Sequence, residues 1–274
     1  FITHAPLRKH EKEYSMSNNL QKMREKNPLV HCITNYVAMN IAANTLLAAG
    51  ASPAMIHTPE ETADFAKVCS ALTVNIGTIS PSWLDGMKRA ILSANDSNIP
   101  WVFDPVAHFA TPYRSMATKE LLNLNPTILR GNASEILGLS GGTSEARGVD
   151  ATDPVSAAEN AARDLAKEYN SVVVITGEVD FVTNGKKNFR VSGGSKLMPS
   201  VTAMGCSLTC LMGAFVSVAE PLSAAISSLV LFSEAGSRAD KLANGPGSFS
   251  SLFQDQLSLI TPDDFDKCKW VEED

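Results

Sequence analysis

The sequence has few of the features of a disulfide-stabilised or zinc-binding protein. Its 274 residues include five cysteines, an odd number, and no two of them form a Cys-x-x-Cys pair. The five histidines do not complete a zinc-ligand pattern with them. Because a disulfide framework is not expected in so long a chain, we expect a reducing, cytoplasmic compartment.

No uninterrupted apolar run is long enough to cross a bilayer. Residues 36–56 are interrupted by Asn40 and Pro53, and residues 210–232 are interrupted by Glu220. A membrane-spanning helix needs about 20 consecutive apolar residues. We therefore assign both stretches to buried helices and expect no membrane partner.

The sequence also has fewer basic residues than acidic ones. The 29 acidic and 23 basic residues give a formal net charge of −6. Proteins that hold nucleic acid through their overall field are usually basic, so nucleic acid is not an expected partner. The chain is 44% apolar and 19% charged, which excludes general disorder and provides a sizeable core.

The first 19 residues show no hydrophobic periodicity. Residues 1–19 are therefore expected to be a disordered arm or an expression remnant ahead of a start near Met16. No linker or internal repeat divides the remainder. We expect residues 20–274 to form a single domain.

From residue 28 onward, short β-rich apolar runs alternate with longer amphipathic runs. This alternation predicts βαβ units and an α/β fold with a mostly parallel central sheet flanked by helices. The turn dipeptide Asn184-Gly185 lies between strand-like residues 181–183 and 188–191 and predicts an antiparallel hairpin at one edge. The other expected strands are 29–33, 53–56, 72–76, 101–104, 127–129 and 172–176, and the expected helices are 36–49, 60–69, 81–95, 114–124, 133–139, 154–169, 205–219 and 221–240.

Ligands of such sheets bind outside the carboxyl ends of the strands. Residues with suitable chemistry follow four apolar runs: Asp104, Arg130, Thr176 and the segment 202–206. Each has an ordinary structural interpretation. Asp-Pro and Thr-Gly initiate turns, Arg-Gly-Asn can cap a helix, and Cys206 with Cys210 can be a pair of small core residues.

Together, these residues supply the components of phosphoryl transfer. A glycine-containing segment at the start of an apolar helix presents free N–H groups to an anion. Carboxylates at neighbouring strand ends can hold Mg²⁺ through water, and Arg130 is suited to phosphate. No Gly-x4-Gly-Lys-Ser/Thr pattern is present, so a P-loop enzyme is excluded.

Nine short motifs occur in order along the chain. They are LVHCITN from residue 29, ASPAM from 51, NIGT from 75, DPV from 104, RGNASE from 130, GVD from 148, TGEVD from 176, GC from 205 and GPGSF from 245. This ordered set resembles the hydroxyethylthiazole kinase family of thiamine salvage, whose members have the ribokinase-like fold. The resemblance covers about residues 20–262.

The resemblance implies ATP-dependent, Mg²⁺-assisted phosphorylation of the primary alcohol of 4-methyl-5-(2-hydroxyethyl)thiazole. It also implies a cytoplasmic homotrimer with sites at subunit interfaces. By motif, the implied site residues are Met55, Ala203 and Asn35 for the thiazole, Arg130 and Thr176 for ATP, Asp104 and Glu135 for the metal, and Gly205 and Cys206 for catalysis. Cys206 stands where wider ribokinase relatives place an aspartate base, and its place at a helix N-terminus predicts a stabilised thiolate.

The sequence departs from the family pattern at two places. The usual Gly-small-Gly-Cys is Ala203-Met204-Gly205-Cys206, and an alanine lacks the freedom of glycine at positive φ. Residues 107–110, Ala-His-Phe-Ala, replace a segment usually rich in small residues. Three alternative functions remain open. The protein can be a kinase of the same fold acting on hydroxymethylpyrimidine, an ATP- or ADP-dependent dehydratase of nicotinamide-cofactor hydrates, or a protein that binds the substrate without turnover.

Overall fold

The computed structural model describes residues 16–141, 154–265 and 267–273. Its strands form one sheet in the order β2-β1-β3-β4-β5-β6-β7-β8-β9, parallel from β2 to β6 and antiparallel from β6 to β9. The strands are β1 (Leu29–Ile33), β2 (Ser52–Ala54), β3 (Ala71–Asn75), β4 (Trp101–Asp104), β5 (Ile128–Asn132), β6 (Val172–Thr176), β7 (Val179–Thr183), β8 (Asn188–Ser192) and β9 (Trp270–Glu273).

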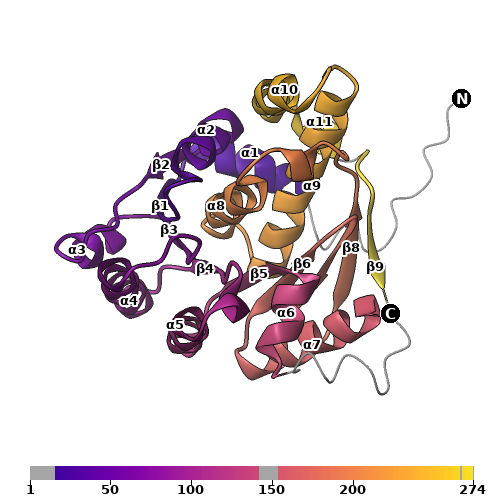
Figure 1. Ribbon diagram of the computed structural model, residues 1–274. Coiled ribbons are helices and arrows are strands. Elements are labelled where there is room, and N and C mark those ends of the chain that lie inside the picture. Colours follow the sequence, from indigo (N-terminus) through magenta and orange to yellow (C-terminus); the bar gives the residue numbers. More distant parts are fainter. Residues whose placement is uncertain (1–15, 142–153, 266, 274) are drawn as a thin grey trace, which may run out of the picture.

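Helices cover both faces of this sheet (Figure 1). One face packs against α1 (Met16–Lys26), α2 (Met39–Ala49), α8 (Met204–Val216), α9 (Pro221–Asp240), α10 (Pro246–Leu259) and α11 (Pro262–Phe265). The other packs against α3 (Thr62–Ala66), α4 (Pro81–Asp96), α5 (Pro112–Leu122), α6 (Ala133–Leu139) and α7 (Pro154–Glu168). Two 3-10 turns, η2 (His108–Ala110) and η4 (Met198–Ser200), precede α5 and α8.

Alternate residues of each strand enter opposite cores. In β6, Val172 and Val174 pack in the first core, whereas Val173 and Ile175 pack in the second. This is the expected consequence of the two-residue period of a strand, and burial on both faces explains why the parallel strands have continuous apolar sequences.

The predicted sheet is confirmed in its main features. The expected bounds of β1, β4 and β6 agree with the structure, and β7 and β8 form the antiparallel hairpin around Asn184-Gly185. Four helices and strands were not expected: α1, α10, α11 and the edge strand β9, which pairs with β8. Among the described residues, no helix is long and apolar enough to cross a membrane.

The expected boundary at residue 20 lies inside a helix. Helix α1 begins at Met16, and both Met16 and Asn19 are buried against α9, where Asn19 donates hydrogen bonds to Ser223 and Ser227. The prediction of disorder is therefore wrong for residues 16–19, because their contacts come from a helix distant in sequence. Residues 1–15 and the motif at 148–150 lie outside the described residues.

Candidate active site

The carboxyl ends of β3 to β6 bring polar side chains together beside the N-terminus of α8. Asn75 ends β3 in register with Asp104 of β4, and Asn132 of β5 pairs with Thr176 of β6. These positions lie at the edge of the sheet where ligands of parallel α/β folds bind. All four predicted regions, Asp104, Arg130, Thr176 and the segment 202–206, meet at this edge.

A chain of side-chain hydrogen bonds ends at the Cys206 thiol. Asn75 Nδ2 donates to Asp104 Oδ2 at 2.9 Å and to Cys206 Sγ at 3.3 Å. Asn35 Nδ2 donates to Asn75 Oδ1 at 2.9 Å and to Cys206 Sγ at 3.4 Å. The two amides therefore use all four of their N–H groups: two on the Cys206 thiol, one on the Asp104 carboxylate and one between the amides themselves.

Asp104 is the most enclosed charged group of the site. Its side chain is fully buried, and Thr209 Oγ1 donates to Oδ2 at 2.9 Å. Oδ1 has no hydrogen-bond partner in the described part of the chain. Burial raises the pKa of Asp104, and nearby Glu135 adds to the rise, whereas Arg130 opposes it. An unpartnered buried acceptor of this kind is costly unless a donor or cation reaches it.

Arg130 links this carboxylate to the end of β6. Its guanidinium lies 3.4 Å from Asp104 Oδ2 and donates to Thr176 Oγ1 at 2.6 Å. The guanidinium also passes close to the start of α8, because a Cβ added at Gly205 would lie 2.6 Å from both terminal nitrogens of Arg130. A side chain at position 205 would therefore force the Arg130 guanidinium to move.

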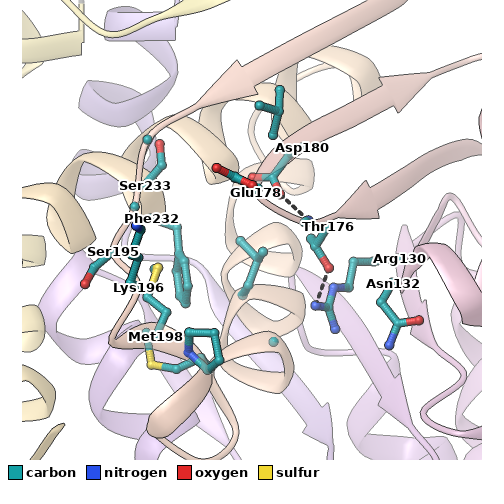
Figure 2. Close-up of a pocket in the computed structure, with 18 residues that line it drawn as sticks. Arg130, Asn132, Thr176, Glu178, Asp180, Ser195, Lys196, Met198, Phe232 and Ser233 are labelled. Atoms are coloured by element: carbon teal, nitrogen blue, oxygen red, sulfur yellow. Dashed lines mark hydrogen bonds between the residues drawn. The ribbon is translucent and has the colours of Figure 1, made fainter. Parts of the chain in front are cut away.

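A cavity of about 1190 Å³ opens beside Arg130. Arg130 and Thr176 lie across it from Lys196 and Met198 (Figure 2). The cavity is lined by Arg130, Asn132, Thr176, Gly177, Glu178, Val179, Asp180, Gly193, Gly194, Ser195, Lys196, Met198, Pro199, Met204, Gly205, Leu208, Phe232 and Ser233. The Arg130 guanidinium and the N-terminus of α8 lie at one end of the cavity. Apolar side chains, among them Met198 and Phe232, also line it.

Asp180 closes the turn between β6 and β7 at the rim of the cavity. Its Oδ1 accepts a hydrogen bond from Gly177 N at 3.0 Å. Burial raises the pKa of Asp180 to about 6, although the Gly177 hydrogen bond and Arg130 both act in the opposite direction. This carboxyl therefore titrates near the pH range in which enzymes work.

Glu135 is held by the main chain. Oε1 accepts from Ala107 N at 2.9 Å and Oε2 accepts from Asn132 N at 2.8 Å, while Asn132 Oδ1 accepts from Glu135 N at 2.9 Å. The last two bonds form a capping box at the start of α6. Glu135 thus has a structural role that its motif did not reveal, and it also ties the loop after β4 to α6.

The expectation of a stabilised Cys206 thiolate is wrong. Burial raises the pKa of the Cys206 thiol to about 11, and the charge of Asp104 adds to the rise. Hydrogen bonds from Asn35 and Asn75 act in the opposite direction. Burial beside a carboxylate outweighs the favourable helix N-terminus, so the side chain is a neutral thiol at neutral pH.

Ala203 adopts the conformation that glycine would provide. At the N-cap of α8 its φ is 60° and its ψ is 18°, in the left-handed region. An L-residue pays about 1–2 kcal/mol for this conformation. Met204, the next residue, is buried and lines the cavity, where a smaller residue would leave more room.

Met55 follows β2 and does not line the cavity. Its side chain is partly buried against the core that contains α8. Two residues later, the ring of His57 approaches Tyr36, next to Asn35, with ring centroids 6.5 Å apart. Tyr36 is 65% exposed at this end of the sheet. The structure therefore separates the segments of Asn35 and Met55 from the residues that surround the cavity, with Cys206 in contact with Asn35.

Two further contributors had no role assigned from the sequence. Asn75 and Thr209 both donate hydrogen bonds to Asp104. The available signal for Asn75 was a polar residue at the end of a buried strand. Thr209 had no signal except its place one turn after Gly205, whose carbonyl its hydroxyl also contacts at 3.2 Å. No group of three or more His, Cys, Asp or Glu side chains in the described ranges forms a metal-binding cluster.

Residues 20–263 match the profile of the hydroxyethylthiazole kinase family. The chain belongs to this family. It is therefore a phosphotransferase, and the reading of the ordered motifs as those of this family is confirmed.

Relatives of the family match nearly the whole chain. A hydroxyethylthiazole kinase of Gemmatimonas aurantiaca is 60% identical over 250 residues, covering 91% of this chain and 90% of the relative. That of Rhizobium etli is 58% identical over 243 residues, covering 88% and 94%.

Solved structures support the same fold. The structure of a hydroxyethylthiazole kinase protein from Pyrococcus horikoshii matches with a TM-score of 0.85 and 38% identity, covering 94% of this chain and 99% of that chain. A pyridoxal kinase from Staphylococcus aureus, in complex with AMP-PCP and pyridoxal, matches with a TM-score of 0.60 at 16% identity, covering 76% and 87%. The second likeness concerns the fold alone, and the two together confirm the ribokinase-like α/β architecture.

Proposed function

We propose that the protein transfers the γ-phosphoryl group of ATP to the primary alcohol of 4-methyl-5-(2-hydroxyethyl)thiazole. The observation that carries the proposal is the continuous arrangement from the cavity to Cys206 through Arg130, Asp104 and Asn75. This arrangement links the Arg130 guanidinium, which lies beside the large cavity, to a second group of residues around Asn35. Transfer between two substrates requires two such neighbouring binding places.

ATP is proposed to occupy the cavity. The cavity volume of about 1190 Å³ is large enough for a nucleotide, since ligand pockets commonly enclose about 300–1,000 Å³. Arg130 and Thr176 would contact the phosphates, because a guanidinium fork suits phosphate oxygens and a hydroxyl can donate to them. The first N–H groups of α8, at Met204, Gly205 and Cys206, would face the transferred group.

The thiazole alcohol is proposed to bind on the other side of Cys206, against Asn35, Met55 and Ala203. Transfer forms a bond from the alcohol oxygen to the γ-phosphorus and breaks the bond from that phosphorus to the bridging oxygen, which leaves with ADP. The alcohol proton leaves to an oxygen of the transferred phosphoryl group or to water. Such transfer has a loose transition state and needs little help from a base. The neutral Cys206 thiol is therefore proposed to position the hydroxyl, and Gly205 to donate its N–H to the developing charge.

Asp104 and Glu135 are proposed to hold Mg²⁺. Asp104 fits this role, because its buried Oδ1 lacks a partner among the described residues. Glu135 fits through water, because each of its oxygens accepts one main-chain N–H and keeps a second lone pair. A bound Mg²⁺ would supply charge neutralisation at the phosphates.

The assembly is proposed to be a homotrimer with sites at subunit interfaces, in the cytoplasm. Exposed apolar side chains near the Asn35 segment, Tyr36 at 65% and Val37 at 58%, agree with a contact surface there. All five cysteines are free, as a reducing compartment requires. Light scattering should give about three times 29.2 kDa, and a fully active monomer would refute the interface site.

An ADP-release assay with and without the thiazole alcohol tests the reaction. We expect release that depends on this alcohol and on Mg²⁺, and mass spectrometry should detect the phosphorylated alcohol. Hydroxymethylpyrimidine and a nicotinamide-cofactor hydrate serve as alternative substrates. Turnover of either in place of the thiazole, or binding of the thiazole without ADP release, would refute the proposal.

A further inference from the structure

Arg114, in the first turn of α5, spans two loops at the carboxyl edge of the sheet. Its Nη1 donates to Ile76 O and to Val106 O, both at 2.9 Å, and its Nη2 donates to Gly77 O at 2.6 Å. Ile76 and Gly77 directly follow β3, and Val106 lies two residues after the end of β4. One guanidinium therefore joins the segments that carry Asn75 and Asp104.

The loop held by Arg114 also fixes the side-chain amide of Asn75. Gly77 N donates to Asn75 Oδ1 at 2.8 Å, and Asn35 Nδ2 donates to the same oxygen at 2.9 Å. With its oxygen occupied in this way, the amide must direct Nδ2 to Asp104 and Cys206. A reversed amide would bring its oxygen against the Asp104 carboxylate, which is repulsive.

The charge and shape of Arg114 suit this task. In the part of the chain that the structure describes, the acceptors of its guanidinium are all main-chain carbonyl oxygens, so the side chain is not part of an ion pair. Only the planar fork reaches carbonyls of both loops in fixed directions, whereas a lysine ammonium would act as a single point charge. The space at Gly77 is equally constrained, since a Cβ there would lie 2.6 Å from Asn35 Nδ2.

We propose that Arg114 is a positioning residue for phosphoryl transfer. It holds the Gly77 peptide, the Gly77 N–H holds the Asn75 amide, and the amide orients Asp104 and Cys206. The expected effect of Arg114 on catalysis rests on the proposed function. The hydrogen-bonded connection from Arg114 through Gly77 to Asn75 does not depend on turnover.

The kinetic test compares Arg114→Ala and Arg114→Lys with wild type. We expect kcat to fall by about 10²-fold for the alanine variant, since small misplacements of reacting groups have effects of this size. The dissociation constant of ATP, measured by calorimetry, should stay within about twofold because Arg130 and Thr176 are untouched. Guanidinium at millimolar concentration should partly restore kcat of Arg114→Ala, and urea should not. Arg89→Ala, at a half-exposed arginine of α4, is the control.

The second test is a double-mutant cycle with Asn75→Ala. If Arg114 acts through Asn75, Arg114→Ala should lower kcat little further in the Asn75→Ala background. Additive losses, an unchanged kcat in Arg114→Ala, or an equal loss of ATP affinity would overturn the proposal.

A third measurement needs no substrate. The Asn75 N–H favours the Cys206 thiolate, so Arg114→Ala should slow alkylation of Cys206 by iodoacetamide about threefold or more, equivalent to a pKa rise of about half a unit. General loosening would instead speed it, and Cys268 in the same digest is the internal control. Suppose that Arg114→Ala slows alkylation but slows it little further in the Asn75→Ala background, and that the protein does not turn over the thiazole. The proposed function is then refuted, and the positioning role of Arg114 stands. Unchanged or faster alkylation would overturn the positioning role.

Discussion

The Arg130 guanidinium occupies the position where a side chain at residue 205 would begin. A Cβ at Gly205 would lie 2.6 Å from both Nη1 and Nη2 of Arg130 and 2.9 Å from its Cζ. The N-terminus of α8 and the cation of β5 can approach this closely only because residue 205 is glycine. This contact brings the N–H groups and the guanidinium to the same end of the cavity.

Gly205→Ala is therefore expected to displace Arg130 and weaken ATP binding. We expect a loss of about 1.5–3 kcal/mol, the range for hydrogen bonds to charged groups. Arg130→Lys should lose a similar amount, because an ammonium does not replace the fork. Calorimetric titration with ATP measures both. Gly247→Ala, where the added Cβ meets nothing within 4 Å, is the matched control. Lower thermal stability with unchanged affinity would show that Arg130 only braces the fold.

Glu135→Gln is expected to have two effects. The glutamine amide has one acceptor oxygen for two main-chain donors, so one of the bonds from Ala107 N and Asn132 N is lost, at a cost of about 1–3 kcal/mol of unfolding free energy. If Glu135 also holds Mg²⁺ through water, kcat should fall and its Mg²⁺ dependence weaken. Denaturant unfolding and a Mg²⁺ titration of kcat separate the two. Glu120→Gln, at an exposed ion pair with Lys88, is the control. An unchanged titration would remove Glu135 from the metal site.

Substitutions of Cys206 test whether a base is needed. A neutral thiol that only positions the hydroxyl predicts that Cys206→Ala and Cys206→Ser lower kcat by less than about 10²-fold, the lower limit for loss of a general base. If Cys206 were a base, Cys206→Asp should equal or exceed wild type, since Asn35 and Asn75 can donate to a carboxylate there. A loss of about 10²–10⁴-fold in the alanine variant would show that Cys206 is the base.

The pH dependence provides a second measurement on Cys206. Because the pKa of the folded thiol is raised to about 11, the folded state keeps this proton where the unfolded chain has lost it. The Cys206 contribution to stability is therefore complete below about pH 8.5 and declines as pH rises towards 11. Alkaline unfolding of Cys206→Ala should lack this decline. A thiolate base would also make kcat climb over the same interval, whereas a positioning thiol would not.

Asp180→Asn is expected to stabilise the protein above pH 6. Burial raises the pKa of Asp180 to about 6, so the folded state binds a proton between the unfolded value and pH 6, and ionisation above this range is unfavourable for folding. Asparagine keeps an acceptor for Gly177 N and removes the charge. Thermal unfolding should show a gain on the order of 1–2 kcal/mol at pH 8 that shrinks towards pH 4. A gain independent of pH would show that the charge is not responsible.

Ala203→Gly should relieve backbone strain at the start of α8. Ala203 has a φ of 60°, and the change to glycine is expected to raise the unfolding free energy by about 0.5–1 kcal/mol after the entropy cost of glycine is subtracted. Ala48→Gly, at a half-buried position inside α2, should instead lower it by about 1 kcal/mol. Equal losses at both positions would exclude strain at Ala203.

The sheet could be predicted from the sequence because its signals are local. The apolar runs of β1, β4 and β6 and the Asn184-Gly185 turn need no knowledge of distant residues. Helix α1 and strand β9 could not be predicted in the same way. Burial of α1 depends on serines of α9 more than 200 residues away, and β9 is defined by its pairing with β8.

The sequence by itself determined the chemistry available at the site and its place at the carboxyl edge, because residue types and strand ends are local properties. Only the tertiary structure decided how these groups behave. It placed the half-buried Cys206 thiol beside Asp104, which reverses the expected direction of the thiol pKa, and it occupied both Glu135 oxygens with main-chain N–H groups. It also brought Arg114 to the loop of Asn75 and Arg130 to Gly205. Desolvation, charge proximity and steric contact depend on atoms far apart in the chain, so no local pattern contains them.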